Sequence, residues 1–277
     1  VPFPRHWLPL IIPNNIMSYP HACVLGLIQG IAEFLPISSS AHLALAPWLL
    51  GWPDQGLTFD VALHAGTLIA IMVYFWRDWL DILSGAAARP SGAQGKLFGM
   101  IILASIPAAL TGLLFEKKAE EALRSPALIA SLMIAFGVLM EVADRRSRRT
   151  RTLHDLTWVW ALIVGCAQAL AIAPGVSRSG STLTAALALG LTREESARFS
   201  FLLATPVIAG AAVLKLRHLH LVDLTGPFLV GVAGSALSGL LAVGYFLSRI
   251  RSTGTWPYTV YRVVSGLGVL IIYYARD

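Results

Sequence analysis

The stretch Leu35-Pro36-Ile37-Ser38-Ser39-Ser40 decides the fold, because it interrupts an apolar region that extends from residue 21 to residue 52. A second apolar region, residues 156–191, is interrupted by Pro174-Gly175-Val176-Ser177-Arg178-Ser179. Each half of either region is too short to span a bilayer, which takes roughly 20 apolar residues. Irregular backbone at membrane depth must be buried in protein or line a water-filled cavity, since its polar groups need partners. We therefore expect two re-entrant helix-loop-helix hairpins.

The rest of the chain has the composition of an integral membrane protein. Of its 277 residues, 56% are hydrophobic and 13% are charged, and the mean hydropathy is +0.69, whereas a soluble domain carries roughly a quarter charged residues. The expected fold is an all-α polytopic membrane protein with about six transmembrane helices plus the two hairpins. The predicted spans are residues 57–76, 97–115, 127–142, 199–216, 228–247 and 258–274.

Domain organisation follows from the same pattern. Residues 17–277 are expected to form a single membrane domain, with residues 1–16 as an N-terminal tail that is either dispensable or an interfacial anchor. Cys23 and Cys166 lie far apart in apolar surroundings, without metal-ligand spacing, and are interpreted as small core residues.

Basic residues predict the orientation of the chain. If the five arginines between Arg145 and Arg151 lie in the cytoplasm, the connecting segment 77–96 is also inside and the mixed loop 116–124 is outside. The first hairpin then opens outward and the second inward. The halves 17–143 and 156–277 thereby acquire opposite orientations, as in an inverted-topology repeat. The recurrence of Gly26-x-x-Gln29 as Gly165-x-x-Gln168 agrees with a duplication.

Ionisable residues inside apolar segments mark candidate functional positions, since each costs roughly 2.5 kcal/mol or more to insert. Glu33 lies four residues after Gln29, so both side chains share one helical face. His42 follows the first serine cluster. Asp60 and His64 share a face of the next span and are expected to support the site.

The second break has the composition of an anion-binding site. Half-helix N-termini and glycine turns direct N–H groups at one point, and an arginine matches phosphate oxygens. The residues concerned are Ser177, Arg178, Ser179 and Thr182. Arg178 needs a partner, either Glu33 or an anionic ligand, and the ligand is favoured. Arg262, in the last span, either ties that helix to the site or reaches an interface.

These residues match what hydrolysis of a phosphoanhydride requires: a nucleophile, a proton acceptor and positive charge. Ser39 is the preferred nucleophile, His42 the base and Arg178 the positive charge. Glu33 with Gln29 would hold a divalent cation or assist proton transfer. Direct attack by a water that Glu33 or His42 activates is the alternative.

Two motifs resemble the signatures of the undecaprenyl-diphosphate phosphatase family, also called the bacitracin-resistance family. The motifs are Gln29-Gly-Ile-Ala-Glu33-Phe-Leu-Pro36-Ile-Ser38-Ser39-Ser40-Ala-His42 and Pro174-Gly-Val-Ser177-Arg178-Ser179-Gly-Ser-Thr182. The stretches Phe59-Asp60 and His64-Ala-Gly66-Thr67 are also similar, and the likeness extends from about residue 17 to the end. Gln29 occupies the first position of the family's acidic pair, where the pattern allows Glu or Gln, and a neutral amide is a weaker metal ligand.

The resemblance implies removal of the terminal phosphate from a C55 polyprenyl diphosphate, which recycles the lipid carrier for peptidoglycan synthesis and confers bacitracin resistance. It implies the bacterial cytoplasmic membrane, a site facing the periplasm, and a divalent cation, Mg²⁺ or Ca²⁺. Membrane lipids are the other expected partners, nucleic acid is not expected, and a homodimer is one of the oligomeric states left open. The implied functional residues are Glu33, Ser39, His42, Ser177, Arg178 and Thr182, with Ser38 and Ser179 added for substrate binding.

Other functions fit less well. A transporter or lipid flippase shares the architecture of broken helices that meet in the membrane, but it needs no nucleophile. An acid-phosphatase type of lipid phosphatase needs a second histidine soon after its Ser-Arg pair, and this chain has none between Arg178 and His218. A nucleotide-driven pump would carry a phosphate-binding Gly-x-x-x-x-Gly-Lys-Ser/Thr loop, which is absent from the sequence.

Overall fold

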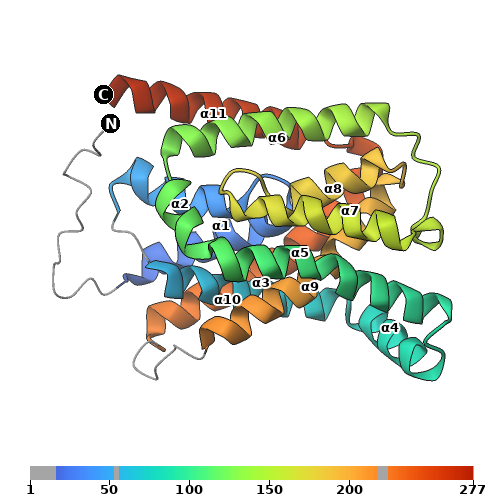
Figure 1. Ribbon diagram of the computed structural model, residues 1–277. Helices are drawn as coiled ribbons and strands as arrows, with labels where there is room; N and C mark the ends of the chain where they lie inside the picture. Colours follow the sequence, from blue (N-terminus) through green and yellow to red (C-terminus); the bar gives the residue numbers. More distant parts are fainter. Residues whose placement is uncertain (1–16, 53–55, 217–223, 277) are drawn as a thin grey trace.

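The computed structural model describes residues 17–52, 56–216 and 224–276 (Figure 1). The predicted tail, residues 1–16, lies outside the described residues. The described residues form α-helices joined by short turns and two short 3-10 helices, with no extended strand among them. The α-helices are α1 (Tyr19–Phe34), α2 (Ser39–Leu50), α3 (Gly56–Tyr74), α4 (Trp76–Ala88), α5 (Ala93–Ala122), α6 (Pro126–Arg146), α7 (Trp158–Ala169), α8 (Arg178–Ala188), α9 (Arg193–Leu216), α10 (Gly226–Thr253) and α11 (Trp256–Arg276).

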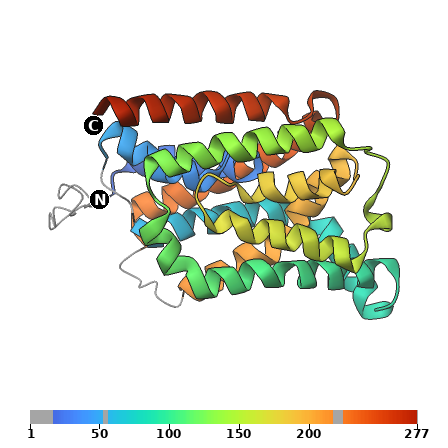
Figure 2. The ribbon, with the colours of Figure 1, turned by 45° about the horizontal axis from the view of Figure 1, so that its top comes forward.

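The prediction of an all-α polytopic membrane protein is confirmed. Within the described ranges, five helices are long and apolar enough to cross a bilayer: α5, α6, α9, α10 and α11. Helices α3 and α4 bend by 73° at a short break and give a sixth span if they are taken together. Helices α6 and α11 lie side by side along one edge of the bundle (Figure 2).

Both apolar regions are broken where the sequence predicted. Helix α1 has 16 residues and α2 has 12, while α7 has 12 and α8 has 11. At about 1.5 Å per residue, none of the four covers the roughly 30 Å of a bilayer core. The first break runs from Leu35 to Ser38. In the second, the 3-10 helix η3 (Leu170–Ile172) follows α7, and Ser177 caps α8.

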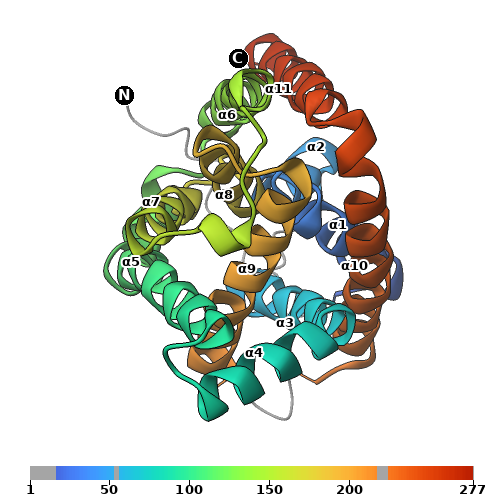
Figure 3. The ribbon, with the colours of Figure 1, turned by 90° about the vertical axis from the view of Figure 1, so that its right-hand side faces the viewer.

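Glycines bring each leading half-helix into backbone contact with the opposite half of the chain. A Cβ atom added at Gly26 would lie 2.3 Å from the carbonyl oxygen of Gly231 on α10. A Cβ atom added at Gly165 would lie 2.3 Å from the carbonyl oxygen of Ala104 on α5. Figure 3 shows α1 beside α10 and α7 beside α5 on opposite sides of the bundle. The two recurring Gly-x-x-Gln segments thus make equivalent packing contacts.

Two details differ from the prediction. Segment 77–96 is not a simple loop, because most of it forms α4, which buries Trp79 and Ile82 and folds back at the end of the bundle (Figure 1). The segment was not predicted as a helix because it is too short and, with Arg77, Asp78 and Asp81, too charged for a span. Cys166 is exposed on α7 and Cys23 is half-buried, so the interpretation of both as core residues is wrong for Cys166.

Candidate active site

The two breaks meet at a cavity of about 340 Å³. One part of its wall is polar and comes from the breaks and from α3, while α5 and α9 supply apolar side chains. A cavity with both kinds of wall can hold a charged headgroup and the start of an apolar chain. Its polar lining includes Glu33, Ser39, Ser40, Asp60, His64, Ser177 and Arg178.

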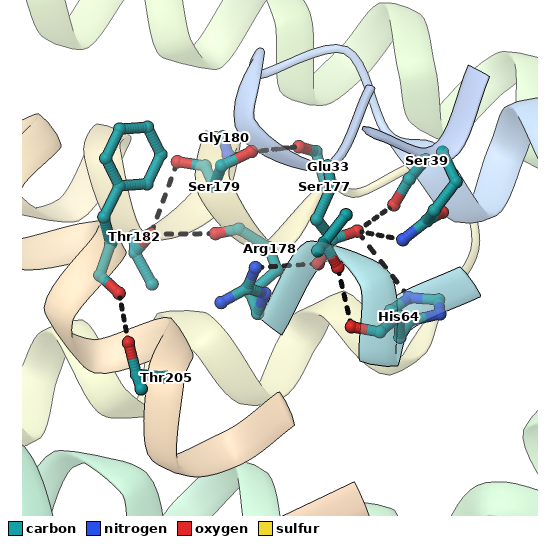
Figure 4. Close-up of polar contacts among 12 residues, drawn as sticks. Glu33, Ser39, His64, Ser177, Arg178, Ser179, Gly180, Thr182 and Thr205 are labelled. Atoms are coloured by element: carbon teal, nitrogen blue, oxygen red, sulfur yellow. Dashed lines mark hydrogen bonds and ion pairs between the residues drawn. The ribbon is translucent and has the colours of Figure 1, made fainter. Parts of the chain in front are cut away.

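Glu33 is the centre of the polar network (Figure 4). Its side chain is only 5% exposed. One carboxylate oxygen, Oε1, accepts from Arg178 Nη2 at 2.7 Å. The other, Oε2, accepts from Ser39 Oγ at 2.5 Å and from Gln29 Nε2 at 3.0 Å, and lies 3.6 Å from His64 Nε2. The structure therefore brings together residues from both breaks and from α3 around one carboxylate.

Arg178 is paired with Glu33, although the sequence analysis favoured an anionic ligand as its partner. A buried arginine needs a counter-charge whether or not a ligand is present, and Glu33 supplies it. The Arg178 side chain is still 15% exposed and lines the cavity. It can therefore contact a phosphate while it remains bound to Glu33.

The two breaks are joined by hydrogen bonds between them. The Gly175 N–H donates to Ser38 Oγ at 3.1 Å, and Ser179 Oγ donates to the Leu35 carbonyl at 3.3 Å. Ser39 is the first residue of α2 and Arg178 the first residue of α8. Because both residues line the same cavity, two half-helix N-termini meet there, which favours an anionic ligand.

Arg262, on α11, donates hydrogen bonds to backbone carbonyls of both breaks and holds them in place. Its side chain is fully buried, and it donates from Nη1 to the Pro36 carbonyl at 3.2 Å and from Nη2 to the carbonyl of Gly175 at 2.6 Å and that of Val176 at 3.1 Å. Its Nε donates to the Met133 carbonyl on α6 at 2.9 Å. Of the two readings for Arg262, the structure supports the one in which it ties the last helix to the site.

His42 does not face Ser39 in this structure. Its Nδ1 lies 2.7 Å from the Ser38 carbonyl and its Nε2 lies 2.6 Å from the Tyr261 hydroxyl, so both ring nitrogens are engaged. The ring also stacks on Tyr261. This arrangement does not support the predicted base role of His42. The histidine beside Glu33 is His64, whose Nδ1 lies 2.7 Å from the Asp60 carbonyl. Its position four residues after Asp60 was the sequence signal for this placement.

Three predicted substrate-binding residues brace the breaks instead of lining the cavity. Thr182 is fully buried, and its hydroxyl donates to the Arg178 carbonyl at 2.8 Å. Ser38 and Ser179 make the hydrogen bonds between the breaks described above. Ser177 and Arg178 do line the cavity. The second motif therefore divides into two residues that line the cavity and two that fix their position.

The oxygen atoms around Glu33 fit a hard cation of the magnesium type. Gln29 Oε1 is buried and has no hydrogen-bond partner among the described residues. Mg²⁺ is usually held by one or two carboxylates together with substrate phosphates, rather than by a cage of protein ligands. Within the described part of the chain, no group of three or more His, Cys, Asp or Glu side chains is arranged to hold a metal ion.

Comparison with known proteins identifies the family. Residues 22–268 match the family described as bacitracin resistance protein BacA. The chain belongs to the BacA family. A relative from Moorella thermoacetica, named undecaprenyl-diphosphatase, is 49% identical over 260 residues, which cover 94% of this chain and all of the relative. Family members with the same printed name from Geobacter sulfurreducens (48% identical, 94% of this chain and 100% of the relative) and Pelotomaculum thermopropionicum (45%, 94% and 99%) are similar over the same extent.

Proposed function

We propose that this protein hydrolyses undecaprenyl diphosphate to undecaprenyl phosphate and inorganic phosphate. The observation that carries the proposal is that Glu33 binds both Ser39 and Arg178 in a cavity with a polar wall and an apolar wall. The printed names of the relatives agree with it. In a bacterium, this reaction recycles the lipid carrier for peptidoglycan synthesis and confers bacitracin resistance.

Ser39 acts as the nucleophile. Its Oγ gives its proton to Glu33 Oε2 and attacks the terminal phosphorus, and the bond from phosphorus to the bridging oxygen breaks as the new Oγ–P bond forms. Undecaprenyl phosphate leaves with the electron pair of the broken bond. Arg178 and the N–H groups at the starts of α2 and α8 stabilise the negative charge on the transferring group. Water then attacks the phosphoserine, and Glu33 returns the proton to Ser39 as phosphate departs.

Direct attack by water is the alternative to a phosphoserine, and the two differ in an observable way. We expect acid-quenched wild-type protein to carry phosphate from substrate labelled at its terminal phosphorus, and Ser39→Ala to carry none. A Ser39→Ala variant with near wild-type turnover and no labelled protein would exclude the nucleophile role and leave water activation by Glu33.

A divalent cation, Mg²⁺ or Ca²⁺, would be held by the Glu33 carboxylate and Gln29 Oε1. When bound, it would neutralise charge on the phosphate oxygens. We expect chelation to lower turnover and re-addition of the cation to restore it.

The site faces the periplasmic side of the bacterial cytoplasmic membrane. One observation supports this orientation. Ala119 and Arg124 line the cavity, and they lie at the end of α5 that charge places outside. A cysteine at Arg124, introduced into a chain in which Cys23 and Cys166 are Ser, should react with a membrane-impermeant maleimide on intact cells, whereas a cysteine at Arg146 should not. The homodimer stays a prediction. The molar mass of the protein in detergent would give its oligomeric state.

The decisive experiment is phosphate release from undecaprenyl diphosphate by detergent-purified protein. We expect turnover by the wild type and a loss of about a hundredfold or more in Glu33→Ala, Ser39→Ala and Arg178→Ala. The melting temperature of Ser39→Ala should be unchanged, whereas Glu33→Ala and Arg178→Ala each leave a buried charge without its partner and should be destabilised by roughly 3 kcal/mol, so turnover is compared for the folded fraction. Ser131→Ala is a matched control, because Ser131 is exposed and, among the described residues, its hydroxyl donates to the Ala127 carbonyl of its own helix. A well-folded wild type without turnover at any cation concentration would refute the phosphatase and favour a transporter.

A further inference from the structure

Gln168 is a buried amide without a partner on the wall of the cavity. The side chain is 2% exposed, and it belongs to the cavity lining together with Arg178 and Ser39. Neither Oε1 nor Nε2 of Gln168 has a hydrogen-bond partner among the described residues. Polar side chains in helices at membrane depth usually bond a neighbouring helix, and a buried amide without a bond is unfavourable. Both amide atoms are themselves buried, so they lack a partner that a ligand in the adjoining cavity would supply.

Comparison with Gln29 explains why this amide is free. Both glutamines end a Gly-x-x-Gln segment on the half-helix that leads into a break. Gln29 Nε2 donates to Glu33, four residues later. The residue four places after Gln168 is Ile172, which offers no acceptor on its side chain and also lines the cavity. Gln168 thus lies before its break as Gln29 does, but no carboxylate stands four residues later to accept from its amide.

The groups around the cavity identify the chemistry that would satisfy Gln168. The side chains of Arg178, Ser39 and Ser177 and two helix N-termini all favour an anion. A diphosphate presents several non-bridging oxygens, more than Arg178 alone can bind. A neutral amide donor suits such an oxygen because it adds a hydrogen bond without a further buried charge.

We propose that Gln168 is a substrate-binding residue whose Nε2 donates to a non-bridging oxygen of the diphosphate. This inference rests on the proposed function, since it names a further contact to the same substrate. It assigns a ligand role to a position outside both break motifs. It also gives the two Gly-x-x-Gln segments different tasks, because Gln29 supports Glu33 whereas Gln168 reaches the headgroup.

Steady-state kinetics of three variants test the proposal. Gln168→Leu removes the donor while keeping most of the volume, Gln168→Glu replaces the donor by an acceptor, and Gln168→Asn shortens the amide. We expect KM for undecaprenyl diphosphate to rise roughly ten- to a hundredfold in Leu, as for one lost hydrogen bond to a charged group, with a smaller change in kcat. The Gln168→Glu variant should raise KM at least as much as Gln168→Leu does, and Gln168→Asn should raise KM less than Gln168→Leu.

Ser196→Ala is the matched control. Ser196 Oγ is also fully buried and without a partner among the described residues, but Ser196 does not line the cavity. Its KM should equal that of the wild type. A Gln168→Leu variant with wild-type KM would overturn the proposal. If the variant had a lower melting temperature and a lower kcat but an unchanged KM, Gln168 would have a packing role and the proposal would also be wrong. If the Leu variant does not fold, the Glu and Asn variants carry the same comparison.

Binding without turnover separates this inference from the proposed function. Methylenediphosphonate, a diphosphate that is not hydrolysed at its bridge, should bind the wild-type protein and bind Gln168→Leu roughly tenfold or more weakly in calorimetry. This difference would support Gln168 as an anion contact even if the wild type released no phosphate. Equal binding by wild type and variant would refute it even if the wild type were an active phosphatase.

Discussion

Ser38 and Ser177 share a positive backbone φ at the starts of α2 and α8, 77° in one and 74° in the other. Each hydroxyl then accepts from the N–H three residues later, Ala41 in one helix and Gly180 in the other. A non-glycine residue in this region is strained by about 1–3 kcal/mol. The helix cap offsets that strain at both turns, and at Ser38 the hydrogen bond from the Gly175 N–H of the other break adds to it.

The first prediction compares Ser177→Ala with Ser177→Gly. Alanine keeps the strained φ and loses the cap, while glycine loses the cap but removes the strain. We expect Ser177→Ala to lower the free energy of unfolding by roughly 1–2 kcal/mol more than Ser177→Gly does. Thermal unfolding in detergent measures the difference. Equal stability of the two variants would show that the backbone relaxes and that φ imposes no constraint there.

The second prediction concerns Arg262. Replacing it with Met would leave the carbonyls of Pro36, Gly175 and Val176 without their donor. Each lost hydrogen bond to a charged group is worth roughly 1.5–3 kcal/mol, without full additivity, so we expect more than 3 kcal/mol of destabilisation. Arg262→Lys should recover part of the stability but little activity, because an ammonium cannot reach both breaks as a guanidinium does.

Turnover and melting temperature, measured together, check the second prediction. Arg249→Met is a suitable control, since Arg249 lies exposed on α10. If Arg262→Lys kept wild-type kcat, the two breaks would hold their relative position without the guanidinium.

Much of this fold could be predicted from local sequence, because a proline and a serine cluster in an apolar region leave few alternatives to a break. The sequence offered Glu33 as one of two partners for Arg178 but could not establish the contact. The two residues are 145 positions apart, and their contact depends on how the two hairpins meet. The sequence favoured His42 as the base, whereas the structure places His64 beside Glu33. Both follow a plausible motif, and the ring direction of His42 is fixed by Tyr261, which is 219 residues away. Helix α4 was missed because its buried side consists of little more than Trp79 and Ile82.

The third prediction separates the two histidines. His42 and Tyr261 form one unit, so His42→Leu, Tyr261→Phe and the double variant should be non-additive, with a coupling of roughly 0.5–3 kcal/mol in stability. His64→Leu removes a cavity residue beside Glu33 and should lower kcat by about tenfold or more with little loss of stability. If His42→Leu instead abolished turnover at full stability, His42 would have to leave Tyr261 and reach the substrate during the reaction.

The fourth prediction addresses the end of the bundle away from the cavity. Asp144 is 2% exposed and accepts from Arg193 through both oxygens, at 2.7 and 2.8 Å, while its Oδ2 also accepts from the Thr255 N–H at 3.1 Å. This carboxylate therefore joins α6 to α9 and to the start of α11. Asp144→Asn keeps the shape but leaves Arg193 without a counter-charge, and we expect roughly 3 kcal/mol of destabilisation.

Since none of these residues lines the described cavity, the folded fraction of Asp144→Asn should keep wild-type KM and kcat. Glu194→Gln is the matched control, because Glu194 is half-exposed and lies 3.7 Å from Arg251, so its loss should change stability by no more than about 0.5 kcal/mol. Chemical unfolding of both variants in the same detergent gives the comparison. If Asp144→Asn were as stable as Glu194→Gln, water would have to enter and solvate Arg193, and the carboxylate would not be the tie between these three helices. If Asp144→Asn were stable but slow, the spacing of the bundle at this end would control the geometry of the breaks at the other.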